Sequence, residues 1–122
     1  MARVLVVDDD PVILELIRLN LELEGHEVTV AEDGVMALQR ARDAHPDVLV
    51  LDVMLPEIDG FEVCRRLQQD PTTATIPVVL LSARALASDV ETGWEAGAVE
   101  YVTKPFDPLD LVEIVERAVA RA

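Results

Sequence analysis

Short apolar runs and segments of helical periodicity alternate along the chain. The apolar or alternating stretches typical of strands lie at residues 4–7, 27–31, 48–51, 77–81 and 99–102. Short runs rich in β-branched residues are typical of parallel strands that are buried on both faces. Apolar residues recur with helical spacing over residues 11–24, 34–45, 61–69, 86–96 and 108–121. The pattern therefore predicts five β-α units in strict succession.

Residues with special backbone preferences mark where the predicted helices begin and end. Asp10 and Asp107 each precede a proline, the arrangement of an N-cap followed by proline at the first helical position. Gly25 and Gly97 supply left-handed ends after two of the helices. Short connections and right-handed crossovers then require one parallel sheet with helices on both faces, a doubly wound α/β fold. We expect residues 1–122 to form one such domain.

Composition and charge exclude several classes of protein. The 122 residues are 51% hydrophobic and 28% charged, which excludes a disordered chain. Ten basic against 24 acidic residues give a formal charge of −14, and a surface this acidic disfavours direct binding of nucleic acids or anionic membranes. The apolar runs fall far short of the ~20 residues of a membrane span. Cys64 is the single cysteine, so an internal disulfide is impossible and we expect a cytoplasmic protein.

The residues that follow the predicted strands are polar and mostly acidic. Asp8 and Asp9 follow the first strand, Asp52 the third, Ser82 the fourth and Lys104 the fifth. In an open parallel sheet, ligands bind outside the carboxyl ends of the strands, and adjacent strands lie about 5 Å apart. Three carboxylates, a hydroxyl and an ammonium group are therefore predicted to converge on one small patch.

An acidic patch of this kind is unfavourable when it is empty. Two carboxylates about 5 Å apart repel each other by roughly 3 kcal/mol at an effective dielectric constant of 20. A hard dication such as Mg²⁺ relieves the repulsion and keeps positions for phosphate oxygens, whereas zinc prefers sulfur or clustered histidines. His26 and His45 stand apart from the patch. One carboxylate can then act as a nucleophile toward phosphorus, while the metal, the lysine and the hydroxyl hold the transferred oxygens.

Four segments, VLVVDDDP, LDVMLPEIDG, VVLLSA and AGAVEYVTKPF, resemble in order and spacing the receiver domain of two-component response regulators, of the chemotaxis-regulator type. The resemblance covers essentially the whole chain. It implies a flavodoxin-like fold with strand order 2-1-3-4-5. It also implies a phosphorelay signalling domain that accepts a phosphoryl group from a histidine kinase or a phosphotransfer protein. Such a domain is not an enzyme beyond catalysing its own phosphorylation and slow dephosphorylation.

The same resemblance implies a phosphoacceptor and a set of metal ligands. Asp52 matches the aspartate that receives the phosphoryl group. Asp8 and Asp9 match the acidic pair that holds Mg²⁺ together with Asp52. Met54 matches the position whose backbone carbonyl coordinates the metal.

The resemblance further implies a switch. Ser82 matches the hydroxyl that turns toward the phosphoryl group, and Lys104 matches the lysine that pairs with it, before a cis peptide bond to Pro105. Tyr101 matches an aromatic residue that turns inward into the space that Ser82 leaves. Phosphorylation is thereby expected to alter the face formed by the fourth helix, the fifth strand and the last helix, where a partner, an effector or a second copy of the chain would bind.

Three other functions fit parts of the pattern. A phosphatase of the haloacid-dehalogenase type also forms an aspartyl phosphate, but it needs a second aspartate at the position of Met54 and usually a cap domain. A flavin-binding protein of the same architecture needs glycine and hydroxyls after the first strand, where this chain has three aspartates. A phosphorylation-independent interaction domain is expected to lose one of Asp9, Asp52 or Lys104, and all three are present.

Other conspicuous residues receive a structural interpretation. Asp10 is expected to cap its helix rather than to bind the metal. Cys64 shares a helical face with Phe61 and is expected to lie in the core. Trp94 is spaced with Leu86 on one face of the helix at 86–96, and we expect it to be core or partly buried.

Overall fold

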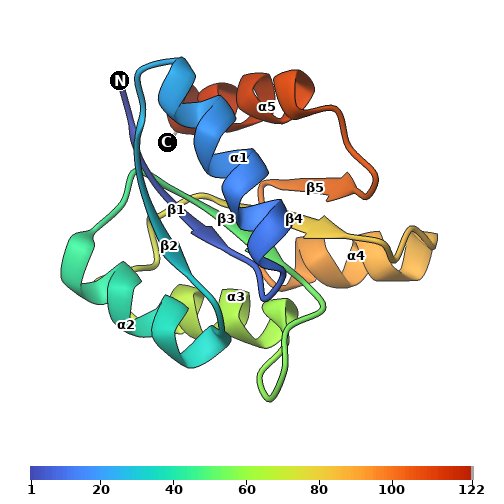
Figure 1. Ribbon diagram of the computed structural model, residues 1–122. Helices are drawn as coiled ribbons and strands as arrows, with labels where there is room; N and C mark the ends of the chain where they lie inside the picture. Colours follow the sequence, from blue (N-terminus) through green and yellow to red (C-terminus); the bar gives the residue numbers. More distant parts are fainter. Residues whose placement is uncertain (122) are drawn as a thin grey trace.

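The computed structural model describes residues 1–121 and shows five strands alternating with five helices (Figure 1). The strands are β1 (Arg3–Val7), β2 (Glu27–Ala31), β3 (Val48–Asp52), β4 (Val78–Ser82) and β5 (Glu100–Thr103). The helices are α1 (Pro11–Leu23), α2 (Gly34–Ala44), α3 (Gly60–Gln69), α4 (Ala87–Glu95) and α5 (Pro108–Arg121). Each element begins and ends within about one residue of the predicted range, which confirms the β-α succession.

The strands form one parallel sheet in the order β2-β1-β3-β4-β5. This is the order that the resemblance implied, so the flavodoxin-like doubly wound fold is confirmed. The parallel arrangement brings the carboxyl ends of all the strands to one edge of the sheet. Within residues 1–121, no helix combines the length and the hydrophobicity needed to cross a membrane.

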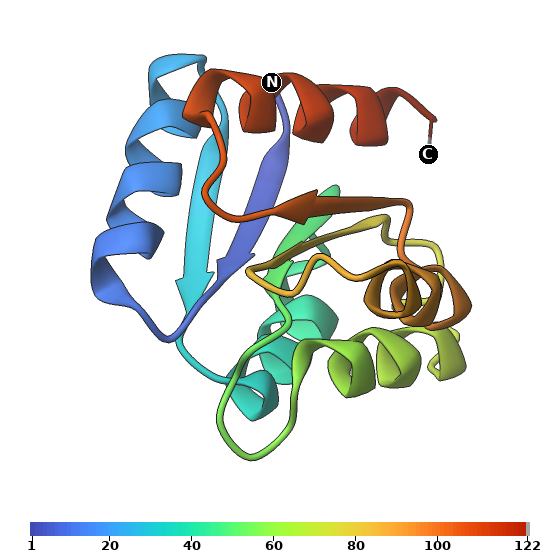
Figure 2. The same ribbon diagram turned by 90° about the vertical axis from the view of Figure 1, so that its right-hand side faces the viewer.

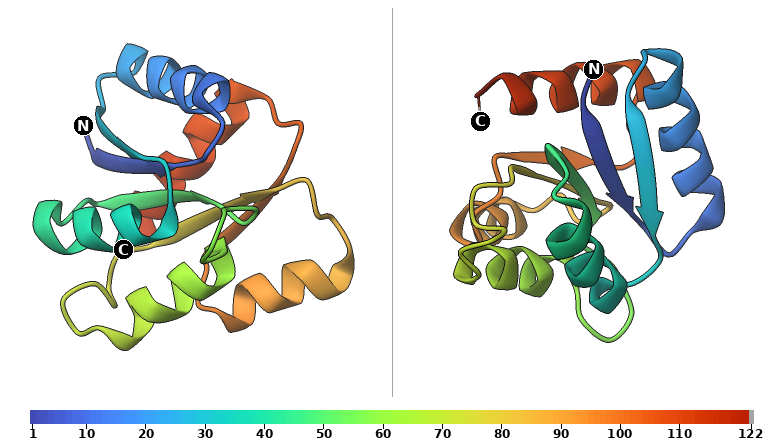
Figure 3. Two further views of the ribbon diagram at one scale, coloured as in Figure 1. Left: turned by 60° about the horizontal axis from the view of Figure 1, so that its bottom comes forward. Right: turned by 90° about the vertical axis from the view of Figure 1, so that its left-hand side faces the viewer.

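Alternate residues of the strands supply two separate hydrophobic cores, one on each face of the sheet. Helices α1 and α5 cover one face, and α2, α3 and α4 cover the other (Figures 2 and 3). In β3, Val48 and Val50 face the first pair of helices, whereas Leu49 and Leu51 face the other three. Because the central strands are buried on both faces, their backbones form a rigid base for the residues at their ends.

The predicted helix signals have their expected geometry. The side chain of Asp10 accepts a hydrogen bond from the Val12 N–H at 2.9 Å, and that of Asp107 accepts one from the Leu109 N–H at 2.9 Å. Gly25 has a φ of +86°, a backbone conformation that glycine adopts without strain. The cap assigned to Asp10 is therefore confirmed.

The burial predicted from the sequence is correct for Cys64 and wrong for Trp94. Cys64 is fully buried, as expected, and burial raises the pKa of its thiol to about 12. The expectation for Trp94 was wrong, because its side chain is 48% exposed and Leu86 is 72% exposed. The buried positions of α4 are instead Asp89 and Gly93, so the helix is rotated relative to the face that its apolar residues indicated.

Gly60, the first residue of α3, packs directly against the end of β3. A Cβ atom at this position would lie 2.7 Å from the Cα of Val53 and would also collide with the carbonyl oxygen of Asp52. The Gly60 N–H donates to the Val53 carbonyl at 2.9 Å. The absence of a side chain therefore lets α3 approach the backbone that carries Asp52.

We predict that Gly60→Ala lowers the free energy of unfolding by about 1–3 kcal/mol, because backbone atoms rather than a flexible side chain oppose the added methyl group. Denaturant unfolding of the two proteins measures the difference. Gln69→Ala, at the exposed far end of α3, is the control and should change stability by less than about 0.5 kcal/mol. Equal effects of the two substitutions would contradict the close approach.

Candidate acidic site at the carboxyl edge of the sheet

Three carboxylates gather where β1 and β3 end. One oxygen from each of Asp8, Asp9 and Asp52 lies within 4.8 Å of the others. Asp8 is 1% exposed and Asp52 is 2% exposed, whereas Asp9 is open to solvent. The predicted convergence of these three residues is therefore present, and two of the three charges lie in a largely water-free environment.

The loop after β1 orients the most buried member of the cluster. The backbone N–H of Asp10 donates to Oδ1 of Asp8 at 2.9 Å, while the Asp10 side chain caps α1. Asp10 thus turns its carboxylate to the helix and its N–H to Asp8. This arrangement explains why the third consecutive aspartate does not belong to the cluster.

Lys104 is the cation that faces the cluster. Its Nζ lies 3.0 Å from Oδ2 of Asp8 and 3.3 Å from Oδ1 of Asp52. The Lys104 N–H donates to the Ser82 carbonyl at 2.8 Å, and the bond to Pro105 is cis, as expected. Partial burial by itself would lower the pKa of Lys104, but its hydrogen bond to Asp8 and the charges of both carboxylates outweigh burial and raise it.

Asp52 carries the electrostatic cost of the arrangement. Burial raises the pKa of its carboxyl group most, and the charge of Asp8 raises it further, while Lys104 and the Met54 backbone N–H lower it by less. Among the buried side-chain atoms of residues 1–121, only Oδ1 of Asp52 lacks a hydrogen-bond partner. The Lys104 ammonium is close enough for an ion pair with this oxygen but is not aligned for a hydrogen bond. An unpartnered buried carboxylate oxygen is unusual and points to a reactive or ligand-binding role.

Ser82 ends β4 beside Asp52 and is fully buried. Its Oγ accepts a hydrogen bond from the Arg84 N–H at 2.9 Å. Tyr101 is already partly buried and packs against the core on the α3 side of the sheet, and its hydroxyl donates to the Arg84 carbonyl at 2.7 Å. Both residues of the expected switch therefore contact the backbone of Arg84, a residue that the sequence did not single out.

The donor set at this edge fits a hard divalent cation. It consists of carboxylate oxygens from three aspartates, one oxygen without a hydrogen-bond partner, and the Lys104 ammonium group pairs with only two of the three acids. Carboxylate and carbonyl oxygens are the ligands that Mg²⁺ prefers. Met54 lies two residues beyond Asp52, and its backbone carbonyl remains a predicted ligand.

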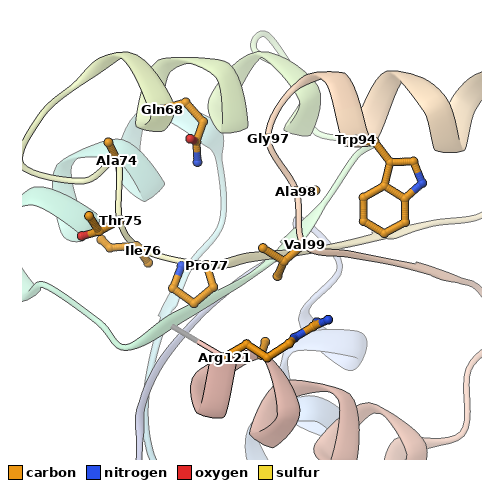
Figure 4. A pocket seen from close by; sticks show the side chains of 11 residues that line it. Gln68, Ala74, Thr75, Ile76, Pro77, Trp94, Gly97, Ala98, Val99 and Arg121 are labelled. Carbon is orange, nitrogen blue, oxygen red and sulfur yellow. The ribbon is translucent and has the colours of Figure 1, made fainter.

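A cavity of about 480 Å³ lies elsewhere, near the amino ends of β4 and β5 (Figure 4). Gln68, Trp94 and Arg121 line it from three different helices. It contains none of the clustered carboxylates and shares no residue with the acidic site. The chemistry that the sequence indicates is therefore at the carboxyl edge of the sheet and not in this cavity.

Comparisons with known proteins agree with this geometry. Residues 4–116 match the family model of the response regulator receiver domain. The transcriptional regulatory protein CseB of Streptomyces coelicolor is 50% identical over 119 residues, which cover 98% of this chain and 49% of CseB. The chain spans about half the length of the curated transcriptional regulators that it matches.

Solved structures give the same result. A response regulator from Chloroflexus aurantiacus J-10-fl is 42% identical and superposes with a TM-score of 0.93. The match covers 98% of this chain and 98% of that structure's chain. The receiver domain of the sensor histidine kinase PA1611 from Pseudomonas aeruginosa PAO1 is 31% identical, with a TM-score of 0.89 and 98% coverage of each chain. That structure holds a magnesium ion in its active-site cleft.

We predict that Asp52→Asn stabilises the metal-free protein in a pH-dependent way. Because the pKa of Asp52 is raised above its ordinary value of 3.8, the folded state favours the protonated carboxyl, and stability is lost as pH rises through the folded-state pKa. The amide avoids this loss, so the variant should be more stable by about 1–2 kcal/mol at pH 7 in EDTA and equal to the parent below pH 3.8.

Denaturant unfolding across this pH range in EDTA measures the difference. Asp43→Asn, which neutralises an exposed carboxylate on α2, is the matched control and should show little pH-dependent gain. A gain for Asp52→Asn that does not change with pH would contradict the electrostatic cause.

Proposed function

Because this chain belongs to the family of response regulator receiver domains, we propose that it accepts a phosphoryl group on Asp52 from the phosphohistidine of a kinase or a phosphotransfer protein. The observation that carries the proposal is the buried, unpartnered Oδ1 of Asp52 beside Lys104 and two further carboxylates. Membership of this family makes the domain a signalling domain, and it leaves the haloacid-dehalogenase phosphatase and the phosphorylation-independent domain without support. Flavin binding likewise has no support.

In the proposed reaction, a carboxylate oxygen of Asp52 attacks the phosphorus of the phosphohistidine. An oxygen–phosphorus bond forms, the phosphorus–nitrogen bond breaks, and its electron pair returns to the imidazole of the donor. Lys104 is positioned to donate to the transferred oxygens because its Nζ already lies 3.3 Å from Asp52. Hydrolysis of the same acyl phosphate by water returns Asp52 and inorganic phosphate, which is the slow self-catalysed dephosphorylation that we expect.

We propose that Asp8, Asp9, Asp52 and the backbone carbonyl of Met54 hold Mg²⁺ in this reaction. When bound, the ion supplies positive charge that offsets the repulsion between the acidic residues and the incoming phosphoryl oxygens. The magnesium found in the PA1611 receiver domain supports this choice of cation. Asp8 is buried and oriented by the Asp10 N–H, so its position is fixed before any cation arrives.

The proposed readout is the surface formed by α4, β5 and α5. Phosphorylation adds a charge of roughly −1.5 to −2 at Asp52, which would attract the Ser82 hydroxyl and Lys104. Glu100 on β5 forms ion pairs with Arg117 and Arg121 of α5, so the strand and the helix form one connected surface. We propose that an effector, another partner or a second copy of the chain binds there.

The proposed surface for the phosphoryl donor is α1. Four apolar side chains on this helix are exposed at helical spacing: Val12, Leu16, Leu19 and Leu23. Leu16 also lines a hollow of about 370 Å³ that reaches Lys104 and Phe106 beside the acidic site. An apolar helical stripe next to the phosphoacceptor fits a helical partner better than it fits a nucleic acid.

We further propose that residues 1–122 act as one receiver domain in the cytoplasm. The buried thiol of Cys64 and a histidine kinase as phosphoryl donor both suit that compartment. The formal charge of −14 disfavours nucleic acid binding by the domain itself, even though several relatives are DNA-binding regulators.

We predict that the protein gains the mass of one phosphoryl group when it is incubated with acetyl phosphate and Mg²⁺. Asp52→Asn should remove the gain, because the amide is not a nucleophile toward phosphorus, whereas Asp43→Asn should keep it. Intact-mass spectrometry over time measures both the gain and its decay. A mass gain that persists in Asp52→Asn would contradict the assignment of the phosphoacceptor.

We predict that Asp9→Asn melts at a higher temperature than the parent in EDTA but gains less from excess Mg²⁺. The substitution removes one of three crowded carboxylates and, with it, one proposed metal ligand. Asp10→Asn is the neighbouring control, since asparagine also caps a helix and Asp10 lies outside the cluster. Equal melting shifts of Asp9→Asn in the two conditions would overturn the metal site.

A further inference from the structure

Gly93 lies inside α4, where glycine is among the least favourable residues for a helix. Its backbone does not require glycine, because its φ is not positive, unlike those of Gly25 and Gly97. The residue is buried on the face of α4 that meets the sheet. A buried glycine with ordinary helical geometry indicates that the missing side chain is what matters at this position.

The ring of Tyr101 occupies the space beside Gly93. A Cβ atom at residue 93 would lie 2.8 Å from Cδ2 and 3.3 Å from Cε2 of Tyr101, and 3.2 Å from Cδ1 of Leu80. Leu80 and Tyr101 are partners in the pairing of β4 with β5, so α4 packs on both of them through a residue without a side chain. An added methyl group would overlap with the ring in its present position.

The obstacle to a side chain at Gly93 differs from the one at Gly60. The three atoms nearest to a Cβ at Gly60 belong to the backbone, whereas those nearest to a Cβ at Gly93 belong to the side chains of Tyr101 and Leu80. A tyrosine side chain can relieve an overlap by changing its rotamer, which leaves the helix and the strand in place. Substitution of Gly93 is therefore expected to move the ring rather than to unfold the helix.

The position of the ring is linked to Ser82 through the backbone of Arg84. The Tyr101 hydroxyl donates to the Arg84 carbonyl at 2.7 Å, and the Arg84 N–H donates to Ser82 Oγ at 2.9 Å. A ring that rotates away from the core gives up its hydrogen bond to Arg84. The inward ring is also the arrangement that the proposed switch has when Asp52 is phosphorylated.

We propose that Gly93 is a positioning residue of the switch: its missing side chain provides the space in which the Tyr101 ring lies inward, and a side chain at residue 93 shifts the ring outward. Gly93 acts through Tyr101 and does not touch the phosphoryl group. Because the inward ring belongs to the phosphorylated arrangement, Gly93 favours that arrangement. The inference rests on the proposed phosphorylation of Asp52.

Beryllofluoride with Mg²⁺ serves as the probe for the phosphorylated state, and the fluorine NMR signal of the bound ligand measures its affinity. We expect Gly93→Ala to bind beryllofluoride about fivefold more weakly than the parent, because the inward ring is disfavoured. In a Tyr101→Ala background, Gly93→Ala should change the affinity by less than about twofold, since no ring remains to be displaced. This dependence on Tyr101 separates the positioning role from a general effect on α4.

The matched control is Ser88→Ala. It also introduces an alanine into α4 and raises the helix propensity, but at an exposed position. Its affinity for beryllofluoride should equal that of the parent. A loss of affinity as large as that of Gly93→Ala would contradict the proposed role of Gly93.

The outcomes separate the role of Gly93 from the function on which it rests. If the parent fails to bind beryllofluoride, the proposed phosphorylation is wrong, and the role of Gly93 in it is wrong as well. If the parent binds and Gly93→Ala binds equally or more tightly, or the loss of affinity persists without the Tyr101 ring, only the role of Gly93 is wrong.

The parent protein provides a second test, which decides the matter should Gly93→Ala lose its helical circular dichroism. With beryllofluoride bound, we expect nuclear Overhauser contacts between the Tyr101 ring protons and the Hα protons of Gly93, because the inward ring lies against this residue. The absence of these contacts in the bound state would overturn the inference.

Discussion

The mutual repulsion of Asp8 and Asp52 is the constraint on which the rest of the structure depends. Both carboxylates are almost completely buried, and Lys104 is the cation that faces them. At roughly 3 kcal/mol for two such charges about 5 Å apart, the repulsion is a sizeable fraction of the 5–15 kcal/mol that stabilises an ordinary domain. The fold maintains this unfavourable cluster because the strands that carry it are packed on both faces. A cation that enters the cluster relieves the repulsion between the carboxylates, so the repulsion favours cation binding.

The apolar core and the acidic edge are therefore parts of one arrangement. Leu49 and Leu51 on one face of β3, and Val48 and Val50 on the other, hold the strand whose last residue is Asp52. Gly60 brings α3 close to the same backbone, so Asp52 has little freedom to relax away from Asp8. A looser core would let the carboxylates separate and would remove the raised pKa of Asp52 that burial causes.

The sequence predicted the strands, the helix caps and the three carboxylates because each depends on a local pattern or on the shared edge of a parallel sheet. It misplaced Trp94 because helical spacing identifies an apolar face but not the one that meets the sheet. On α4 the buried positions are Asp89 and Gly93, where Gly93 gives room to Tyr101 and Asp89 meets Arg84. Arg84 itself carried no sequence signal, since its importance comes from side-chain and backbone contacts across a loop that no periodicity describes.

The position of Tyr101 changes how a phosphorylation signal can travel. The resemblance implied that the ring turns inward into the space that Ser82 leaves, and in the structure the ring packs against the core with its hydroxyl on the Arg84 carbonyl. Hydrogen bonds through the Arg84 backbone join Ser82 to Tyr101, and an ion pair joins the Arg84 side chain to Asp89 on α4. In the proposed switch, a change at Asp52 reaches α4 by altering which of these bonds is kept, because a buried hydrogen bond is given up only when another partner replaces it.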